Sequence, residues 1–195
     1  MTPWASVLRR LVASVVFVWA MSATAASATP ILSIDPATTT VNVGDTFTLN
    51  IDIAGVIDLF SYNFDLAFDQ SILAFQSIVE GPFPQSAAST FFIAGQELTP
   101  GYVSFTGNTV IGPTGVSGGG TLAIATFLAL MAGTTSIILP DQLFIDSNFN
   151  SIAFDAINSG LVEVIGVASP VPDEPSTMIL LALALAAGRS FTRAS

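Results

Sequence analysis

The chain has 195 residues, fourteen acidic and four basic, with a net charge of −10 and with neither cysteine nor histidine. These absences exclude disulfide bonds, histidine or cysteine metal sites, and catalytic triads that need a histidine base. All four basic residues are terminal arginines, so the stretch between Leu11 and Gly188 offers no cation for nucleic-acid phosphates. We therefore expect no nucleic-acid partner.

Residues 1–28 have the pattern of a secretory signal peptide. Arg9 and Arg10 precede an apolar run, Leu11–Met21, and small residues follow it. The A-x-A pattern formed by Ala26 and Ala28 predicts cleavage after Ala28, with the segment 23–25 as a competing site. Because a membrane-spanning helix needs about 20 apolar residues, this run is too short to serve as an anchor. We expect an exported chain from which the signal helix has been removed.

Residues 29–166 show the alternation that is typical of β-strands. In Thr46–Ala54 and in Phe60–Asp69, apolar residues occupy every second position, which predicts one buried and one solvated face. Thr121–Met131 is apolar on both faces and predicts a central strand covered on both sides, with a buried helix as the alternative. Turn residues separate such runs at short intervals, so we predict one all-β domain, a β-sandwich or barrel of about nine strands.

The segment from Glu80 to Pro100 is less regular and contains Phe83, Phe91 and Phe92. Exposed aromatic side chains often anchor interfaces, so these three residues are the candidates for a partner-binding surface. The alternative is that residues 90–94 form another core strand, because the segment is rich in β-branched and aromatic residues.

Two loops have part of the composition of ligand-binding loops. Asp146–Asn150 begins like a calcium loop, but Ser151 and Ile157 replace the glycine and the acid of an EF-hand, so a hairpin turn is favoured. Gly112–Gly120 is followed by no lysine, which excludes a phosphate loop and favours a flexible hairpin connection. A carboxylate pair could support glycoside hydrolysis, but solvated surface charge is the simpler interpretation. We predict no catalytic residue, no metal site and no cofactor.

Several motifs occur in the order and spacing of a cohesin domain. They are Val43–Gly55, Asp58–Asp69, Ile72–Phe75, Gly118–Phe127, Ala132–Ser136 and a closing hairpin from Phe144 to Val164. Together they resemble a cohesin over residues 31–166. The resemblance implies a jelly-roll β-sandwich of nine strands, related to carbohydrate-binding modules. It also implies that one sheet face binds a dockerin domain through main-chain and polar contacts around an apolar patch.

Residues 167–195 resemble a PEP-CTERM sorting signal, in which a linker, 167–177, precedes a short apolar helix and a basic tail, 178–195. The motif residues are Pro172, Asp173, Glu174, Pro175, Ser176 and Thr177, and the membrane stop runs from Met178 to Ala187, followed by Arg189 and Arg193. The resemblance implies processing by an exosortase, with the arginines held on the cytoplasmic side of the inner membrane. Asp173 replaces the first proline, and the apolar run would span only about 15 Å as a helix. A degenerate, non-functional tail is the alternative.

Three functions fit this sequence. The first is a non-catalytic interaction module for a secreted, dockerin-type partner, as the resemblance implies. The second is a carbohydrate-binding module acting on exopolysaccharide, which is weakened because Trp4 and Trp19 lie in the signal and Tyr62 is in phase with the core face. The third is an acidic structural matrix protein without a discrete ligand. In each case we expect a location at the cell surface or in the extracellular matrix, with transient anchoring by the C-terminal segment.

Overall fold

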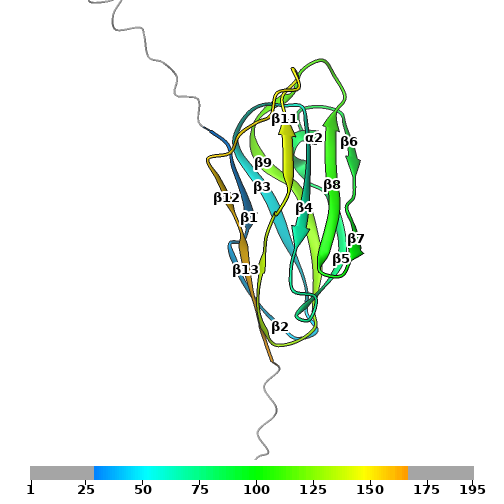
Figure 1. Ribbon diagram of the computed structural model, residues 1–195, viewed down its shortest axis with the longest axis vertical. Helices are drawn as coiled ribbons and strands as arrows, with labels where there is room; N and C mark the ends of the chain where they lie inside the picture. Colours follow the sequence, from blue (N-terminus) through cyan, green and yellow to red (C-terminus); the bar gives the residue numbers. More distant parts are fainter. Residues whose placement is uncertain (1–28, 167–195) are drawn as a thin grey trace, which may run out of the picture.

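The computed structural model describes residues 29–166, so the predictions for the signal peptide and the sorting tail lie outside the described residues. These residues form an elongated β-sandwich, with the described chain starting in the upper half of Figure 1 and ending at its lower tip. No helix among them is long and apolar enough to cross a membrane. The elements are β1 (Ile31–Asp35), β2 (Thr38–Asn42), β3 (Thr46–Leu59), β4 (Ser61–Ala67), β5 (Leu73–Glu80), α2 (Pro82–Gln85), β6 (Thr90–Ile93), β7 (Gln96–Thr99), β8 (Tyr102–Val110), β9 (Val116–Ala129), β10 (Gly133–Ile137), β11 (Gln142–Ile145), β12 (Ala156–Asn158) and β13 (Gly160–Ile165).

Three sheets make up the sandwich. One has the strand order β12-β1-β3-β9-β5, the second has the order β11-β4-β8-β6 with β7 also paired to β8, and a small sheet has the order β10-β13-β2. The last strands pair in parallel with the first ones, β12 with β1 and β13 with β2, so both ends of the domain close the same side of the sandwich. The prediction of an all-β, jelly-roll sandwich is confirmed, and short segments raise the strand number above nine.

The alternation of apolar residues determines which side chains fill the core. In β3, Leu49, Ile51 and Ile53 are buried, and in β4 Tyr62, Phe64 and Leu66 face them from the opposite sheet. Side chains on alternate positions of a strand point to opposite faces, so each strand contributes one continuous apolar row. The predicted inward faces of both segments are therefore confirmed.

One sequence prediction about β9 is wrong and a second is confirmed only in part. The strand starts at Val116, so the second half of the glycine-rich stretch Gly112–Gly120 is paired strand and not a flexible connection. A side chain at Gly119 would collide with the main chain of Ile53, which shows how closely β3 approaches. β9 is a central strand between β3 and β5, as predicted, and not a helix. It is not fully covered on both sides, however, because Ile124, Thr126 and Leu128 on its outer face are only half-buried.

The predicted closing hairpin from Phe144 to Val164 is also wrong. β11 pairs with β4, whereas β13 pairs with β10 and β2, so the two strands belong to different sheets. The tight turn predicted at Asp146–Asn150 is present, since the main-chain N–H groups of Asn148 and Asn150 both donate to Asp146 Oδ1 at 2.8 Å. The chain then returns past β11 and crosses to the other sheet to form β12.

Candidate partner-binding face

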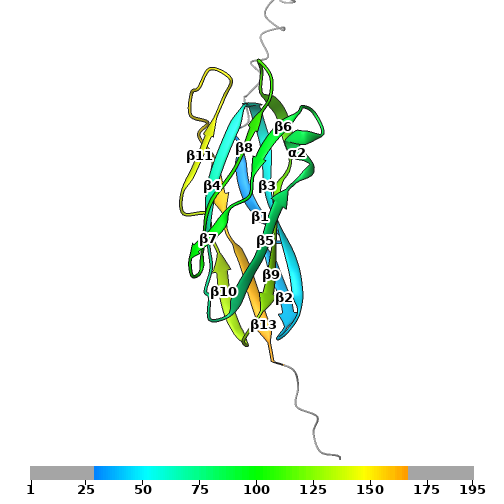
Figure 2. The ribbon, with the colours of Figure 1, turned by 90° about the vertical axis from the view of Figure 1, so that its right-hand side faces the viewer.

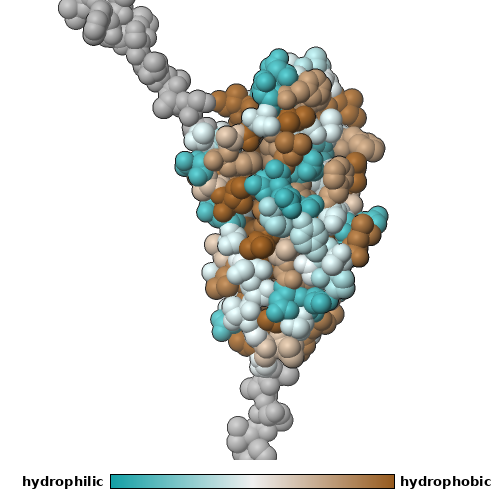
Figure 3. Space-filling view, viewed as in Figure 1, coloured by the Kyte–Doolittle hydropathy of each residue, from teal (hydrophilic) through white to brown (hydrophobic). Residues whose placement is uncertain are grey.

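The outer surface of the β11-β4-β8-β6 sheet exposes large apolar side chains on neighbouring strands. We call it the outer sheet face and define it by four exposed apolar residues and four polar residues of the intervening strands: Phe91, Ile93, Phe105, Leu143, Ser61, Asn63, Asp65 and Thr109. Phe91 is 62% exposed, Phe105 54%, Leu143 49% and Ile93 42%. Apolar and polar side chains are interspersed over the side of the domain seen in Figure 3.

Strand register brings these residues into rows across the sheet. Asn63 of β4 lies between Leu143 of β11 and Gly107 of β8, and Gly107 is opposite Ile93 of β6. In the next row Ser61 is paired with Thr109, and Thr109 with Phe91. The Ser61 hydroxyl lies 2.9 Å from the Thr109 hydroxyl, so this row is braced by a side-chain hydrogen bond. The face is thus a polar strip flanked by apolar side chains.

Phe105 lies on the outer sheet face because of a bulge in β8. The pairing of β4 with β8 shifts between Phe64 and Leu66, and Phe105 adopts a positive φ of 56°. A Cβ placed on Gly107 would lie 3.6 Å from the Phe105 ring, so the ring lies over this glycine and beside Asn63. Non-glycine residues in this backbone region are strained and cluster at functional sites. The bulge therefore presents an exposed aromatic ring on a rigid sheet.

Two carboxylates and a phenol hold the bulge in place. Asp65 Oδ1 accepts a hydrogen bond from the main-chain N–H of Phe105 at 2.8 Å, and Asp65 Oδ2 accepts one from the Tyr102 hydroxyl at 2.7 Å. The same hydroxyl lies 3.2 Å from Asp141 Oδ2. The hydrogen bond to Asp65 raises the pKa of Tyr102, since both neighbouring carboxylates oppose formation of a phenolate. The phenol therefore stays neutral and acts as a donor.

The three predicted contact residues have different locations. Phe91 is exposed on β6, as a contact residue requires, while Phe92 points inward and packs against the core. Phe83 is buried, so its predicted place on an exposed loop is wrong. A Cβ at Gly120 would lie only 3.0 Å from Phe83 Cβ, which shows that the missing side chain makes room for this ring. Residues 90–93 do form a strand, but an edge strand with one exposed face.

Sequence reasoning missed Phe105, Ile93 and Leu143. Alternation from Val103 would place Phe105 in the core, because nothing in the local sequence signals the bulge. After the bulge Thr106 takes the inward position and is fully buried.

The sugar-binding alternative gains no support from the tyrosines. Tyr62 is buried and donates to the main-chain oxygen of Leu122 at 2.8 Å, and burial raises its pKa, while the Tyr102 hydroxyl is bonded to Asp65.

One carboxylate links the loops at one end of the sandwich. Asp58 accepts hydrogen bonds from the main-chain N–H of Gly115 at 2.7 Å and from the Ser147 hydroxyl at 2.6 Å. The bond from the Ser147 side chain is the main reason why the pKa of Asp58 is lowered. Asp146 also has a lowered pKa, chiefly through its bond from the Asn150 side chain. Within residues 29–166, no three acidic side chains are close enough together to hold a metal ion.

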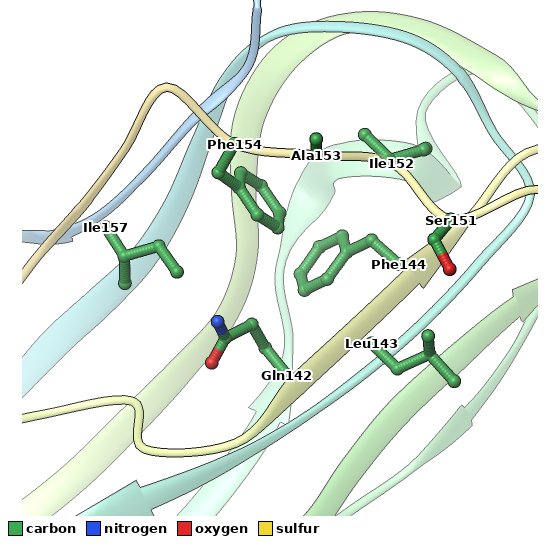
Figure 4. Close-up of a pocket in the computed structure, with 8 residues that line it drawn as sticks. All are labelled: Gln142, Leu143, Phe144, Ser151, Ile152, Ala153, Phe154 and Ile157. Carbon is green, nitrogen blue, oxygen red and sulfur yellow. The ribbon is translucent and has the colours of Figure 1, made fainter.

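A shallow pocket of about 320 Å³ lies between β11 and the segment that leads into β12. Its walls are mostly apolar, formed by Phe144, Ile152, Phe154 and Ile157, and Figure 4 shows the Gln142 side chain among them. Gln142 Oε1 is buried and accepts no hydrogen bond from the described residues. Leu143, at the border of the outer sheet face, also lines the pocket, and none of the lining residues is acidic or basic, so the Ser151 hydroxyl there has no base within the pocket.

Comparisons with known proteins agree with this architecture. The family model described as the cohesin domain matches residues 32–164. A similar solved structure is the sixth cohesin of scaffoldin B from Acetivibrio cellulolyticus, in complex with a mutant Cel5 dockerin, with 16% identity, a TM-score of 0.59 and coverage of 70% of this chain and 99% of that one. The OlpC cohesin–dockerin complex from Clostridium thermocellum has 15% identity, a TM-score of 0.59 and coverage of 75% and 99%.

A third similar structure is the non-cellulosomal cohesin from the archaeon Archaeoglobus fulgidus, with 14% identity, a TM-score of 0.57 and coverage of 77% of this chain and 98% of that one. At such identities the structural matches establish a common fold. No curated protein sequence matches this chain.

Proposed function

Because this chain belongs to the cohesin-domain family, we propose that it is a non-catalytic binding module that captures a dockerin-type protein on the outer sheet face. Two of the similar solved cohesins are complexes with dockerins, which supports a partner of this kind. Protein interfaces rely on a few exposed aromatic and aliphatic anchors set in a polar surround. The outer sheet face has this composition.

The observation that carries the proposal is the conformation of Phe105. Its ring is 54% exposed although its backbone is strained and its N–H is held by Asp65. A strained main chain that exposes an apolar ring lowers the stability of the free domain and is explained if the ring is used in binding. Rigid presentation also reduces the entropy that is lost when a partner binds.

We expect that Phe105→Ala weakens binding of a dockerin domain by about 2 kcal/mol, or about 30-fold in Kd, because the central anchor of the face is lost. Isothermal titration of residues 29–166 with purified dockerin domains encoded in the same genome measures this change. The matched control is Val79→Ala, which removes a 51% exposed apolar side chain from the other sheet. Equal affinities for the wild type and Phe105→Ala would show that the outer sheet face is not the binding surface.

The export and sorting signals complete the proposed function. Residues 1–28 would direct export, and the motif Pro172–Thr177 would deliver the chain to an exosortase, so that the domain acts at the cell surface or in the matrix. This is supported by the arginines that flank both apolar segments. The described chain ends at the lower tip of the sandwich in Figure 1, whereas the outer sheet face extends along its side. A tether at the C-terminus would therefore leave this face open.

For the exported protein, we expect an N-terminus at Thr29 and a C-terminus near the sorting motif. Intact-mass measurement and N-terminal sequencing of protein recovered from the culture medium and from the membrane fraction test both ends. Full-length protein in the cytosol would contradict export. Secreted protein that keeps residues 178–195 would contradict processing by an exosortase while leaving the binding proposal unaffected.

A further inference from the structure

β6 is a four-residue edge strand that contains no charged residue, proline or bulge. It ends the sheet β11-β4-β8-β6, and the segment Ser89–Gln96 contains no charged residue and no proline. Exposed edges are normally protected by charges, prolines, bulges or very short strands. Among the other edges, β5 has a bulge, β12 has three residues, and β7 contains Glu97 and is followed by Pro100, whereas β2, β10 and β11 contain no charged residue or proline.

The hydrogen-bond pattern shows which main-chain groups of β6 face outward. The Ile111 N–H donates to the Ser89 oxygen at 2.8 Å, which places Ser89 in a hydrogen-bonded pair with β8. Hydrogen-bonded and free residues alternate along an antiparallel strand, so Phe91 and Ile93 also turn their main-chain groups toward β8. Thr90 and Phe92 therefore direct their N–H and C=O groups to the open edge. This edge faces the viewer in Figure 2.

We propose that β6 pairs antiparallel with β6 of a second copy of this chain, about a two-fold axis that passes beside Phe92. In this register Phe92 exchanges two main-chain hydrogen bonds with its counterpart, and Thr90 lies opposite Ala94 of the second copy. Both positions have their main-chain groups directed outward, as the pairing requires. A two-fold axis makes the interface self-complementary and closed, which gives a dimer and not a filament.

Side chains support the same register. Phe91 lies directly opposite Ile93 of the second copy, and both residues are exposed on the outer sheet face of the single domain, at 62% and 42%. The pair is of the non-hydrogen-bonded type, in which the two side chains are closest. Two such apolar pairs form, one on each side of the axis. No charge is brought next to another charge within the paired segment, because Ser89–Gln96 is neutral.

The charge of the domain opposes this association and makes it dependent on salt. Residues 29–166 contain twelve acidic and no basic residues, so two copies repel each other. This repulsion is screened as the Debye length falls from about 30 Å in 0.01 M salt to about 3 Å in 1 M salt. We expect dimers to be favoured at high salt, in contrast to associations that depend on opposite charges.

Dimerisation would join two outer sheet faces into one continuous sheet of eight main strands, with both faces on the same side. This inference goes beyond the proposed capture of a dockerin-type protein, because it concerns a second copy of the chain and depends on the strand edge. Two joined faces would bind a partner that carries two docking modules with increased avidity.

Sedimentation velocity of residues 29–166, which enclose their own core, tests the proposal. Protein concentrations up to about 1 mM are used, so that a dimer with a Kd as weak as about 1 mM is still detected. We expect a monomer–dimer equilibrium that shifts toward dimer with salt, and slowed amide exchange of Thr90 and Phe92 in the dimer. Phe91→Asp and Ile93→Lys are each expected to weaken dimerisation by about tenfold. The double variant Phe91→Asp/Ile93→Lys leaves the net charge unchanged, places Asp opposite Lys and is expected to dimerise more strongly than either single variant.

Two controls separate this edge from other surfaces. Leu98→Asp adds the same charge to the 76% exposed residue of the neighbouring strand β7, and Phe105→Ala alters the binding proposal without touching the edge. In 1 M salt, where repulsion between the two copies is screened, both variants are expected to leave the dimerisation constant unchanged. Monomers at every salt concentration would overturn the proposal. A dimer that Phe91→Asp does not weaken, or a double variant that is weaker than both single variants, would overturn it as well.

Discussion

Replacement of Phe127 by alanine is expected to lower the free energy of unfolding by about 3–5 kcal/mol. Phe127 is fully buried in β9, at the point where the rings of three strands and a loop meet. Its ring centroid lies 5.9 Å from that of Phe47, 5.2 Å from that of Phe68 and 6.0 Å from that of Phe75. Register pairs it with Phe47 on one side and Phe75 on the other, so neither neighbouring strand can close the cavity by itself.

Chemical denaturation of residues 29–166 measures this loss, which is about a fifth or more of the roughly 5–15 kcal/mol that is typical of whole domains. The matched control is Phe91→Ala, in which the same atoms are removed from a side chain that is mostly exposed; at dilution we expect a change within about 0.5 kcal/mol. A loss below about 1 kcal/mol for Phe127→Ala would show that the surrounding rings collapse into the space and that the core is loosely packed.

The core of the sandwich could be predicted from the sequence because its signal is local. In Phe60–Asp69 every second residue is apolar, and the side-chain period of a strand is two, so Tyr62, Phe64 and Leu66 had to share one face. The same argument placed Leu49, Ile51 and Ile53 correctly. Both predictions depend only on residues within one strand.

The candidate site could be predicted only in part, because it depends on a bulge and on strand register. Phe91 was found as an exposed aromatic residue, but Phe105 was not, since a single inserted position in β8 moves it from the inner to the outer face. That shift is stabilised by Asp65 and Tyr102, which belong to two strands. The prediction that Phe83 is an exposed contact residue was wrong for a similar reason. Its burial depends on the glycines of β9, which follow it by more than thirty residues. Contacts between strands are not encoded in the pattern of either strand alone.

The second large effect is expected at Gly81, which joins β5 to α2. Gly81 has an ordinary φ of −80°, so its importance is not conformational. A Cβ at this position would collide with the main-chain oxygen of Thr121 and would lie 2.6 Å from the carbonyl carbon of the same residue. The Gly81 N–H donates to the Leu122 oxygen at 2.9 Å, and the buried Tyr62 hydroxyl donates to the same oxygen at 2.8 Å.

Gly81→Ala is therefore expected to lower the free energy of unfolding by about 2–4 kcal/mol, through overpacking and the loss of one or both hydrogen bonds. The neighbouring atoms belong to the main chain of β9, which is paired with β3 and β5 on its two sides and cannot move independently. Gly112→Ala is the matched control, since nothing lies within 4 Å of its added methyl group. Thermal and urea unfolding of both variants measure the difference. If Gly81→Ala were as stable as Gly112→Ala, β9 would have to yield at this point, and the rigid support inferred for the Tyr62 hydroxyl would be wrong.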